Sequence, residues 1–323
     1  MRHFPNWECL ILKVIDMQTE IYILSGFLGS GKTTLLKQLL AEEKKQDRKV
    51  AVMMNELGKV SIDSDAVGDG VSLKELLDGC ICCTIQDKLE SQLQELLLVD
   101  KPEVIYIETT GAAHPVEVLD AILSPLFADK MVVKGIITIV DGKRWLHRSS
   151  LTPQVQQLIL EQVRHADLLV INKTDELTEE EQSKLLMEIQ SLNPHAFALL
   201  TTFAKVPMGK IKQLTSSKKN KHTSVAVTSD FKLSTYVYTF EHAIEQMEFE
   251  DFLRKLPDTI YRIKGYVKFP SYKHAILFQF SYGMPLYLKE NMNLPLNLVF
   301  IGENIDWVEI ERDLRKLEKK DNE

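Results

Sequence analysis

Cysteine is scarce in this sequence and unevenly placed. The chain of 323 residues contains only four cysteines, and three of them, Cys80, Cys82 and Cys83, fall within four consecutive positions. So few cysteines in a chain of this length exclude a disulfide-stapled scaffold. Their clustering indicates chemistry that uses thiolates.

Long hydrophobic runs and an excess of positive charge are also missing. No stretch approaches the roughly 18 apolar residues that a membrane span requires, and Lys13 interrupts the apolar run near the N-terminus. With a net charge of -7 and one short basic run at residues 218–221, the chain carries no field that would attract a phosphate backbone. We therefore expect a cytoplasmic protein that binds neither membranes nor nucleic acids.

The order of apolar segments predicts two domains after an N-terminal extension of residues 1–18. From residue 19 to residue 214, short β-branched runs alternate with amphipathic segments, which is typical of an α/β domain with a mostly parallel, doubly wound sheet. Residues 215–231 are polar and form the candidate linker. Residues 232–323 contain successive strand-like segments and two amphipathic segments, which predict a small α+β domain with a largely antiparallel sheet.

A phosphate-binding loop is the strongest motif. Residues 26–34 read GFLGSGKTT and match G-x-x-x-x-G-K-[ST], between a predicted strand and a predicted helix. In this pattern Lys32 reaches the β- and γ-phosphate oxygens and the Thr33 hydroxyl ligates Mg²⁺, while the backbone and the helix N-terminus attract the phosphates. The plain alternative is a glycine-rich turn before a helix. The predicted nucleotide-binding residues of the loop are Gly26, Gly29, Ser30, Gly31, Lys32, Thr33 and Thr34.

A second motif predicts which base is bound. Asn172, Lys173 and Asp175 follow an apolar segment that reads as a strand. The Asp175 carboxylate can accept both guanine N–H groups, which adenine lacks, while the Lys173 stem covers the ring and Asn172 braces the loop. GTP is therefore favoured over ATP. Such residues also end strands and cap helices, but the phosphate loop upstream favours the guanine interpretation.

Mg²⁺ bound to a nucleotide usually has a carboxylate nearby, at the end of a strand beside the phosphates. Glu108 ends one apolar run and Asp141 ends another. We favour Glu108, because Gly111 follows it closely and would let the backbone approach a γ-phosphate. The sequence therefore predicts Thr33 and Glu108 as the magnesium ligands and Gly111 as a further contact with the nucleotide.

The three clustered cysteines predict a site for a soft metal ion. Thiolates suit Zn²⁺ or Cu(I) and lie outside the preferences of Mg²⁺ and Ca²⁺. One short segment does not enclose an ion tetrahedrally by itself, so we expect one or two further ligands from elsewhere, with Glu56 and His114 as candidates. Buried structural cysteines are the alternative for the thiols, and a lone histidine is more often structural than a ligand.

Glu56 has more than one possible task. It follows the second predicted strand, where a nucleotide-sensing loop would lie. There it could contact Mg²⁺, orient the attacking water or complete the thiolate site, and the sequence leaves these roles open. The candidate catalytic residues are thus Lys32, Thr33, Glu56 and Glu108.

Taken together, these motifs resemble the CobW-like family of metal-handling GTPases. The similarity runs from about residue 20 to residue 317 and rests on residues 26–34, 55–58, 62–63, 79–84, 108–111, 172–175, 264–266 and 298–302. The resemblance implies a P-loop GTPase domain, a CobW-type C-terminal domain, and a Cys-x-Cys-Cys motif that binds zinc or cobalt-like ions depending on the nucleotide. Leu57 and Lys59 depart from the phenylalanine and glutamate that members often carry, which removes one potential carboxylate ligand. The linker holds only His222 where many members are histidine-rich, so a single transferable ion is expected.

The predicted function is therefore a GTP-hydrolysing metallochaperone. Mg-GTP would order the loops near the cysteines, metal would bind, and hydrolysis would release zinc, or alternatively cobalt, to an apo-metalloprotein client. No arginine finger or catalytic glutamine is evident, which predicts slow intrinsic hydrolysis, accelerated by the client or by a homodimer. The first alternative is a regulatory GTP-binding protein whose cysteines sense zinc or redox status without transferring metal. An ATP-dependent small-molecule kinase is a third, which leaves the guanine motif and the cysteines unexplained.

Overall fold

The computed structural model describes residues 18–55, 71–76, 84–214, 233–281, 283–289 and 294–318. The linker predicted at 215–231, the N-terminal extension, Glu56 and the cysteines Cys80, Cys82 and Cys83 lie outside these described residues. Within them, no helix is long and apolar enough to cross a membrane.

The first domain is built on a parallel sheet of seven strands in the order β3-β2-β4-β1-β5-β6-β7. Its strands are β1 Thr19–Ser25, β2 Val50–Asn55, β3 Ser72–Leu76, β4 Val104–Glu108, β5 Met131–Asp141, β6 Leu168–Asn172 and β7 Phe197–Leu200. The central strands are nearly continuous apolar runs because helices cover the sheet on both faces. Strands β2 to β4 lie on one side of β1, and strands β5 to β7 lie on the other. Where the strand order of a parallel sheet reverses in this way, ligands bind at the carboxyl ends of the strands.

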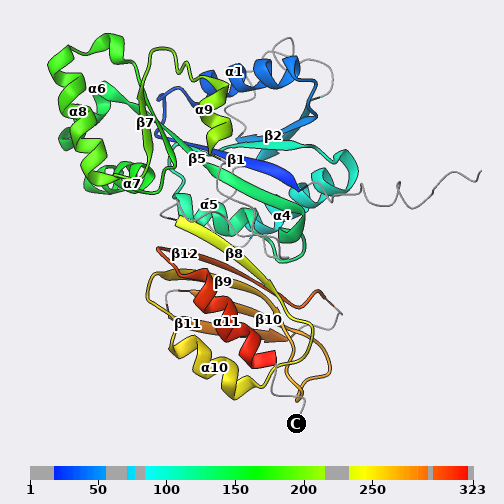
Figure 1. Ribbon diagram of the computed structural model, residues 1–323. Coiled ribbons are helices and arrows are strands. Elements are labelled where there is room, and N and C mark those ends of the chain that lie inside the picture. The colour runs from blue at the N-terminus through cyan, green and yellow to red at the C-terminus, as the bar shows by residue number, and fades with distance from the viewer. Residues whose placement is uncertain are drawn as a thin grey trace, which may run out of the picture.

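Helices occupy both faces of this sheet (Figure 1). On one face, α1 Lys32–Lys45 and α9 Met208–Gln213 bury leucine and isoleucine side chains against the strands. The other face carries α4 Thr84–Glu95, which continues as a π-helical turn at Leu96–Asp100, and α5 Pro115–Ile122. A separate cluster of apolar side chains joins β5 and β6 to α6 Gly142–Leu146, α7 Pro153–Arg164 and α8 Glu179–Leu192.

The second domain is a five-stranded antiparallel sheet with two helices on one face. The strand order is β11-β10-β9-β12-β8. Its elements are β8 Leu233–Thr239, α10 Gln246–Arg254, β9 Ile260–Val267, β10 Ile276–Ser281, β11 Met284–Lys289, β12 Asn297–Glu303 and α11 Trp307–Glu318. Phenylalanine and tyrosine side chains of the strands pack under α10 and α11. The predicted α/β fold followed by an α+β domain is thus confirmed.

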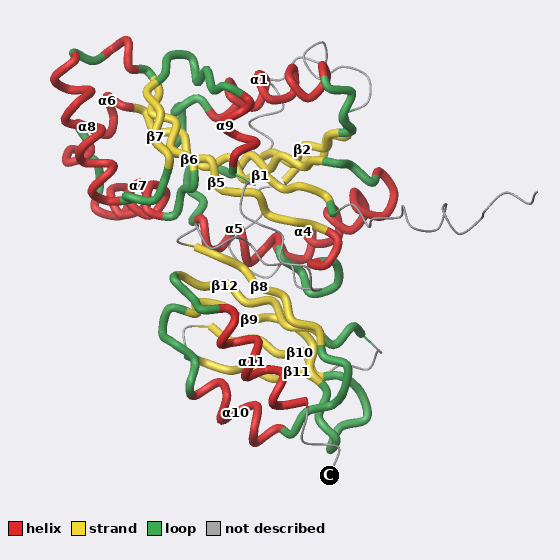
Figure 2. Tube along the Cα trace, in the orientation of Figure 1, coloured by secondary structure: helices red, strands yellow, loops and turns green. Residues whose placement is uncertain are grey.

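The two domains share a hydrophobic core, which we call the domain joint. Leu233, Val237, Val299 and Ile301 of β8 and β12 pack with apolar residues of α4 and α5. The molecule therefore has five layers, with α4 and α5 lying between the two sheets (Figure 2). Asn297 reinforces the joint by donating a buried hydrogen bond of 2.6 Å to the carbonyl of Pro125.

Candidate functional site

The phosphate loop lies where the sequence predicts it, between the end of β1 and the start of α1. Gly31, just before Lys32, has a φ of 116°. A Cβ atom at Gly31 would lie 2.5 Å from Nδ2 of Asn172, so the backbone here needs glycine for both reasons. The same Nδ2 donates to the carbonyl of Ser30 at 2.8 Å, which holds the loop to the end of β6.

Lys32 and Thr33 begin α1 and project toward the end of β4. The buried ammonium of Lys32 donates to the carbonyl of Gly26 at 2.7 Å. The Thr33 hydroxyl donates to Oε1 of Glu108 at 2.7 Å. The predicted pair of magnesium ligands, Thr33 and Glu108, is therefore in direct contact.

Burial dominates the electrostatics of this corner. Desolvation lowers the pKa of Lys32, although the nearby Glu108 opposes that shift. Desolvation raises the pKa of Glu108, against the hydrogen bond from Thr33 and the charge of Lys32. Oε2 of Glu108 is buried and makes no hydrogen bond to any described residue. A divalent cation would bind that oxygen of Glu108 and favour the charged carboxylate. The residues present thus fit Mg²⁺.

The geometry explains why Asp141 does not share this position. The β1 residue Leu24 pairs with Glu108, whereas Asp141 lies three positions beyond Thr138, the β5 partner of Ser25. Asp141 instead pairs in register with Asn172, where its Oδ2 accepts from Lys173 at 2.6 Å and its Oδ1 accepts the Arg144 N–H at 3.0 Å. Burial opposes ionisation, but these bonds prevail and lower the pKa of Asp141.

The backbone after β4 packs directly on the phosphate loop. A Cβ atom at Gly111 would lie 2.6 Å from the backbone nitrogen of Leu28. Only glycine permits this approach, so a shift of either segment is transmitted to the other. The Gly111 carbonyl in turn accepts a hydrogen bond of 3.1 Å from Nε2 of Gln162 on α7.

The residues of the predicted guanine motif have different surroundings. Asn172 is buried, and its Oδ1 accepts the Ala204 N–H at 2.8 Å while its amide holds the phosphate loop. Lys173 has a left-handed φ of 61°, and its ammonium is fixed by Asp141. Asp175 is exposed to solvent. The structure therefore brings Asn172 to the phosphate loop, holds Lys173 at Asp141 and leaves Asp175 at the surface.

Among the candidate ligands for a soft metal, only His114 belongs to the described residues. It is the N-cap of α5 and lies beside His165 and Glu161 of α7. Sequence reasoning missed this pair, although their spacing of four residues on an amphipathic segment places both side chains on one helix face.

Arg144 is another residue that sequence reasoning missed. Its guanidinium donates to the carbonyl of Leu28 and lies 5.1 Å from the ring centroid of Phe27. It therefore covers the outer side of the phosphate loop. No motif in the sequence marks it, because it reaches the loop from the helix that follows β5.

Two family models account for most of the chain. Residues 20–199 match the model described as CobW/HypB/UreG, nucleotide-binding domain, and residues 233–318 match the cobalamin synthesis protein cobW C-terminal domain. This chain belongs to the CobW/HypB/UreG family. The family and the class predicted from the motifs, a CobW-like P-loop GTPase, are therefore confirmed.

Proteins named zinc chaperones are among the relatives. The chain is 30% identical to the zinc chaperone YjiA of Escherichia coli over 281 residues, which cover 80% of this chain and 85% of YjiA. It is 36% identical over 168 residues to the zinc chaperone YeiR of the same organism, which covers 52% of this chain and half of YeiR. A crystal structure of Zn(II)-bound YjiA aligns over 94% of this chain and 99% of that one, with 23% identity and a TM-score of 0.48.

Proposed function

We propose that this protein is a GTP-dependent metallochaperone that binds a thiophilic divalent metal through Cys80, Cys82 and Cys83 and delivers it to a client in the cytoplasm. Zinc is the preferred cargo, with cobalt as the alternative. The observation that carries the proposal is the hydrogen bond from Thr33 to Glu108, together with the close packing of Gly111 on the phosphate loop. The names of the relatives YjiA and YeiR, both zinc chaperones, support the choice of cargo.

The nucleotide is held by groups at the carboxyl edge of the sheet. The loop from Gly26 through Gly29, Ser30 and Gly31 to Thr34 presents backbone N–H groups to the phosphates, and Lys32 supplies a positive charge. Thr33 and Glu108 would hold Mg²⁺, which neutralises charge on the phosphates when bound. Asn172 and Lys173 secure the loop, and Asp175 selects guanine.

Nucleotide state is sensed by the segment from Glu108 to His114. Glu108 contacts Thr33, and Gly111 touches the phosphate loop at Leu28. Loss of the γ-phosphate removes a charge from this corner, so the segment has a different lowest-energy position in the GTP and GDP states. We expect slow intrinsic hydrolysis, and Glu56 is the candidate for positioning the attacking water.

The elements on either side of the cysteines support this coupling. Along the chain the cysteines follow β3, which ends at Leu76, and precede α4, which begins at Thr84. Glu75 pairs with Met54, which pairs with Glu108. The strand that leads to the cysteines is thus two strands from Glu108, about 10 Å. A client or a second copy of the chain would take the ion when the loops relax.

A metal competition titration tests the proposal. Zn²⁺ and Co²⁺ are titrated anaerobically against a chromophoric chelator, with the protein bound either to Mg and a non-hydrolysable GTP analogue or to Mg-GDP. We expect tighter binding with the GTP analogue, because GTP and metal must favour each other's bound state by the same factor. The variant with Cys80, Cys82 and Cys83 all changed to Ser should lose this difference.

Two results would contradict the cycle. Equal affinity in both nucleotide states would remove the coupling that a carrier requires and leave a structural metal. Reversible thiol oxidation that alters GTP affinity, without transfer of metal to any apo-protein, would favour the regulatory alternative. A preference for ATP in a nucleotide competition would instead favour the kinase.

A further inference from the structure

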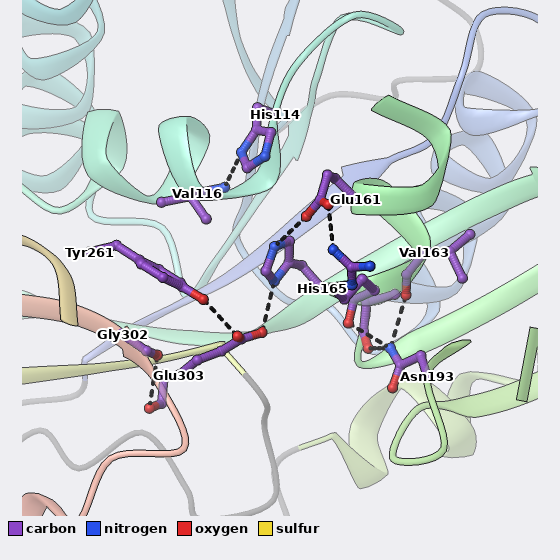
Figure 3. A network of polar contacts seen from close by, with 12 residues as sticks. His114, Val116, Glu161, Val163, His165, Asn193, Tyr261, Gly302 and Glu303 are labelled. Carbon is purple, nitrogen blue, oxygen red and sulfur yellow. Dashed lines mark hydrogen bonds and ion pairs between the residues drawn. The ribbon is translucent and has the colours of Figure 1, made fainter. Parts of the chain in front are cut away.

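Three potential ligands converge where α5 begins and α7 ends (Figure 3). His114 precedes α5, and Glu161 and His165 lie one turn apart at the end of α7. One ligand atom from each side chain lies within 4.8 Å of the other two. Among the described residues this is the group of histidine, cysteine and acidic side chains with metal-binding spacing. It lies apart from the phosphate loop, and none of the proposed GTP contacts uses Glu161 or His165.

His165 is buried between two carboxylates. The side chain is 5% exposed. Its Nε2 lies 3.1 Å from Oε2 of Glu161, and its Nδ1 lies 3.4 Å from Oε1 of Glu303. Nδ1 of His165 is buried and makes no hydrogen bond to any described residue, so the ring's fixed contact is the one to Glu161. Arg164 pairs with the other oxygen of Glu161, Oε1, which leaves Oε2 directed at the ring.

His114 supplies the second imidazole of the group. Its ring lies 5.9 Å from that of His165, measured between centroids. Nδ1 of His114 accepts the Val116 N–H at 3.3 Å, a long bond. Metal binding by the neutral ring through either nitrogen would give up this bond.

Glu303 acts as a support for His165 and belongs to the other domain. It ends β12, and its Oε2 accepts a hydrogen bond of 2.6 Å from the hydroxyl of Tyr261. With Oε1 facing Nδ1 of His165, the carboxylate can fix the ring so that Nε2 is directed at Glu161. Carboxylates orient metal-binding histidines in this way.

We propose that His114, Glu161 and His165 bind a divalent transition-metal ion of the zinc class, at a site separate from the three cysteines, with Glu303 positioning His165. Two imidazoles and one carboxylate suit Zn²⁺ and leave a fourth position for water. In a tetrahedral site with bonds of about 2.0–2.1 Å, ligand atoms lie about 3.3 Å apart. The pair formed by Nε2 of His165 and Oε2 of Glu161 already has this spacing. His114 alone must move closer.

An ion here would join three parts of the molecule. His114 ends the segment that starts at Glu108 and touches the phosphate loop. Gln162, next to Glu161, donates to the carbonyls of Gly111 and Ala113 at 3.1 and 3.2 Å. Glu303 belongs to the C-terminal domain. The ion would therefore link the nucleotide-sensing segment to α7 and, through Glu303, to the position of the C-terminal domain.

The test uses the full chain with Cys80, Cys82 and Cys83 changed to Ser, so that the three clustered thiolates do not compete. Co²⁺ is titrated against a chelator and its absorption spectrum is recorded. We expect one bound ion with a tetrahedral spectrum that lacks thiolate charge-transfer bands. His114→Asn on this background should abolish binding, because asparagine keeps the N-cap but supplies no imidazole. Glu303→Gln should weaken binding about 10- to 100-fold, as expected for a supporting carboxylate.

Matched controls separate ligation from damage to the fold. His195→Asn removes an exposed histidine of the connection between α8 and β7 and should leave affinity unchanged. Circular dichroism of every variant, without metal, should match the parent. Absence of Co²⁺ binding to the triple-serine protein, or unchanged affinity in His114→Asn, would overturn the proposal and leave His165 as a structural residue that contacts Glu161. This outcome is independent of the nucleotide-dependent binding by the cysteines, which is measured in the chain that retains them.

Discussion

The phosphate loop and the proposed metal site of His114, Glu161 and His165 are assembled in opposite ways. Lys32 and Thr33 are neighbours in sequence, and one strand–loop–helix unit positions both. His114, His165 and Glu303 come from three elements of two domains. A local site depends on backbone geometry that short sequence motifs record, whereas a dispersed site depends on packing that no single segment encodes. The two sites therefore differ in how they respond to mutation.

The largest expected effect is at the local site. Lys32→Ala should lower kcat for GTP hydrolysis by about 10²- to 10³-fold, because it removes a buried positive charge from the phosphate loop. Single-turnover hydrolysis measures the effect. Lys44→Ala, an exposed residue of the same helix, is the control and should hydrolyse GTP at the parent rate. Parent-like hydrolysis by Lys32→Ala would refute the assigned role.

Removing a support of the dispersed site should cost stability. The Asn193 side chain donates to the carbonyls of Val163, Arg164 and Ala166, on both sides of His165, at 2.9–3.0 Å. Asn193→Ala removes a side-chain donor from three carbonyls, of which that of Val163 keeps the Ala166 N–H, and should lower the free energy of unfolding by about 2–4 kcal/mol. Urea denaturation measures it. Ser191→Ala, where the hydroxyl is exposed, should change the value by less than about 0.5 kcal/mol.

The loss of preference for GTP over ATP on changing Asp175 is expected to be of intermediate size. Asp175→Asn should reduce the preference for GTP over ATP by about 10- to 100-fold, since the amide cannot accept both guanine N–H groups. Competition binding with the two nucleotides measures the ratio. Glu176→Gln, at the adjacent exposed position, should keep the preference. An unchanged ratio in Asp175→Asn would mean that the base is recognised elsewhere.

The smallest effect is expected for an ion pair across the joint. Nζ of Lys264 in β9 lies 3.8 Å from Oε2 of Glu90 in α4. Lys264→Met should change the free energy of unfolding by about 1 kcal/mol or less, because the apolar core carries most of the contact between the domains. A double-mutant cycle with Glu90→Gln isolates the pair. A coupling well above that size would show that charge holds the joint together.

Sequence patterns anticipated most of the fold because its strands are either continuous apolar runs or clear alternations. They missed β3, whose residues 72–76 include a lysine and a glutamate, and β11, whose side chains are largely exposed. Both are edge strands, and partner strands stabilise them more than their own composition does.

The choice between Glu108 and Asp141 shows where local patterns stop. Each ends an apolar strand, so the sequence favoured Glu108 only through the nearby Gly111. Register decides the matter, because β5 extends beyond β1 and carries Asp141 to Lys173, while Glu108 stops level with Thr33.

His114 shows the same limit more strongly. Its sequence neighbours suggested a ligand for the cysteine site, which lies outside the described residues, and the tertiary structure also places it beside His165 and Glu161. By itself the sequence determined the phosphate loop, the guanine motif and the order of the two domains, because these depend on short-range backbone geometry and hydrophobic period. Only the tertiary structure decided which carboxylate meets Thr33 and which histidines meet each other, because those distances depend on strand register and on how helices far apart in the sequence pack on the sheet.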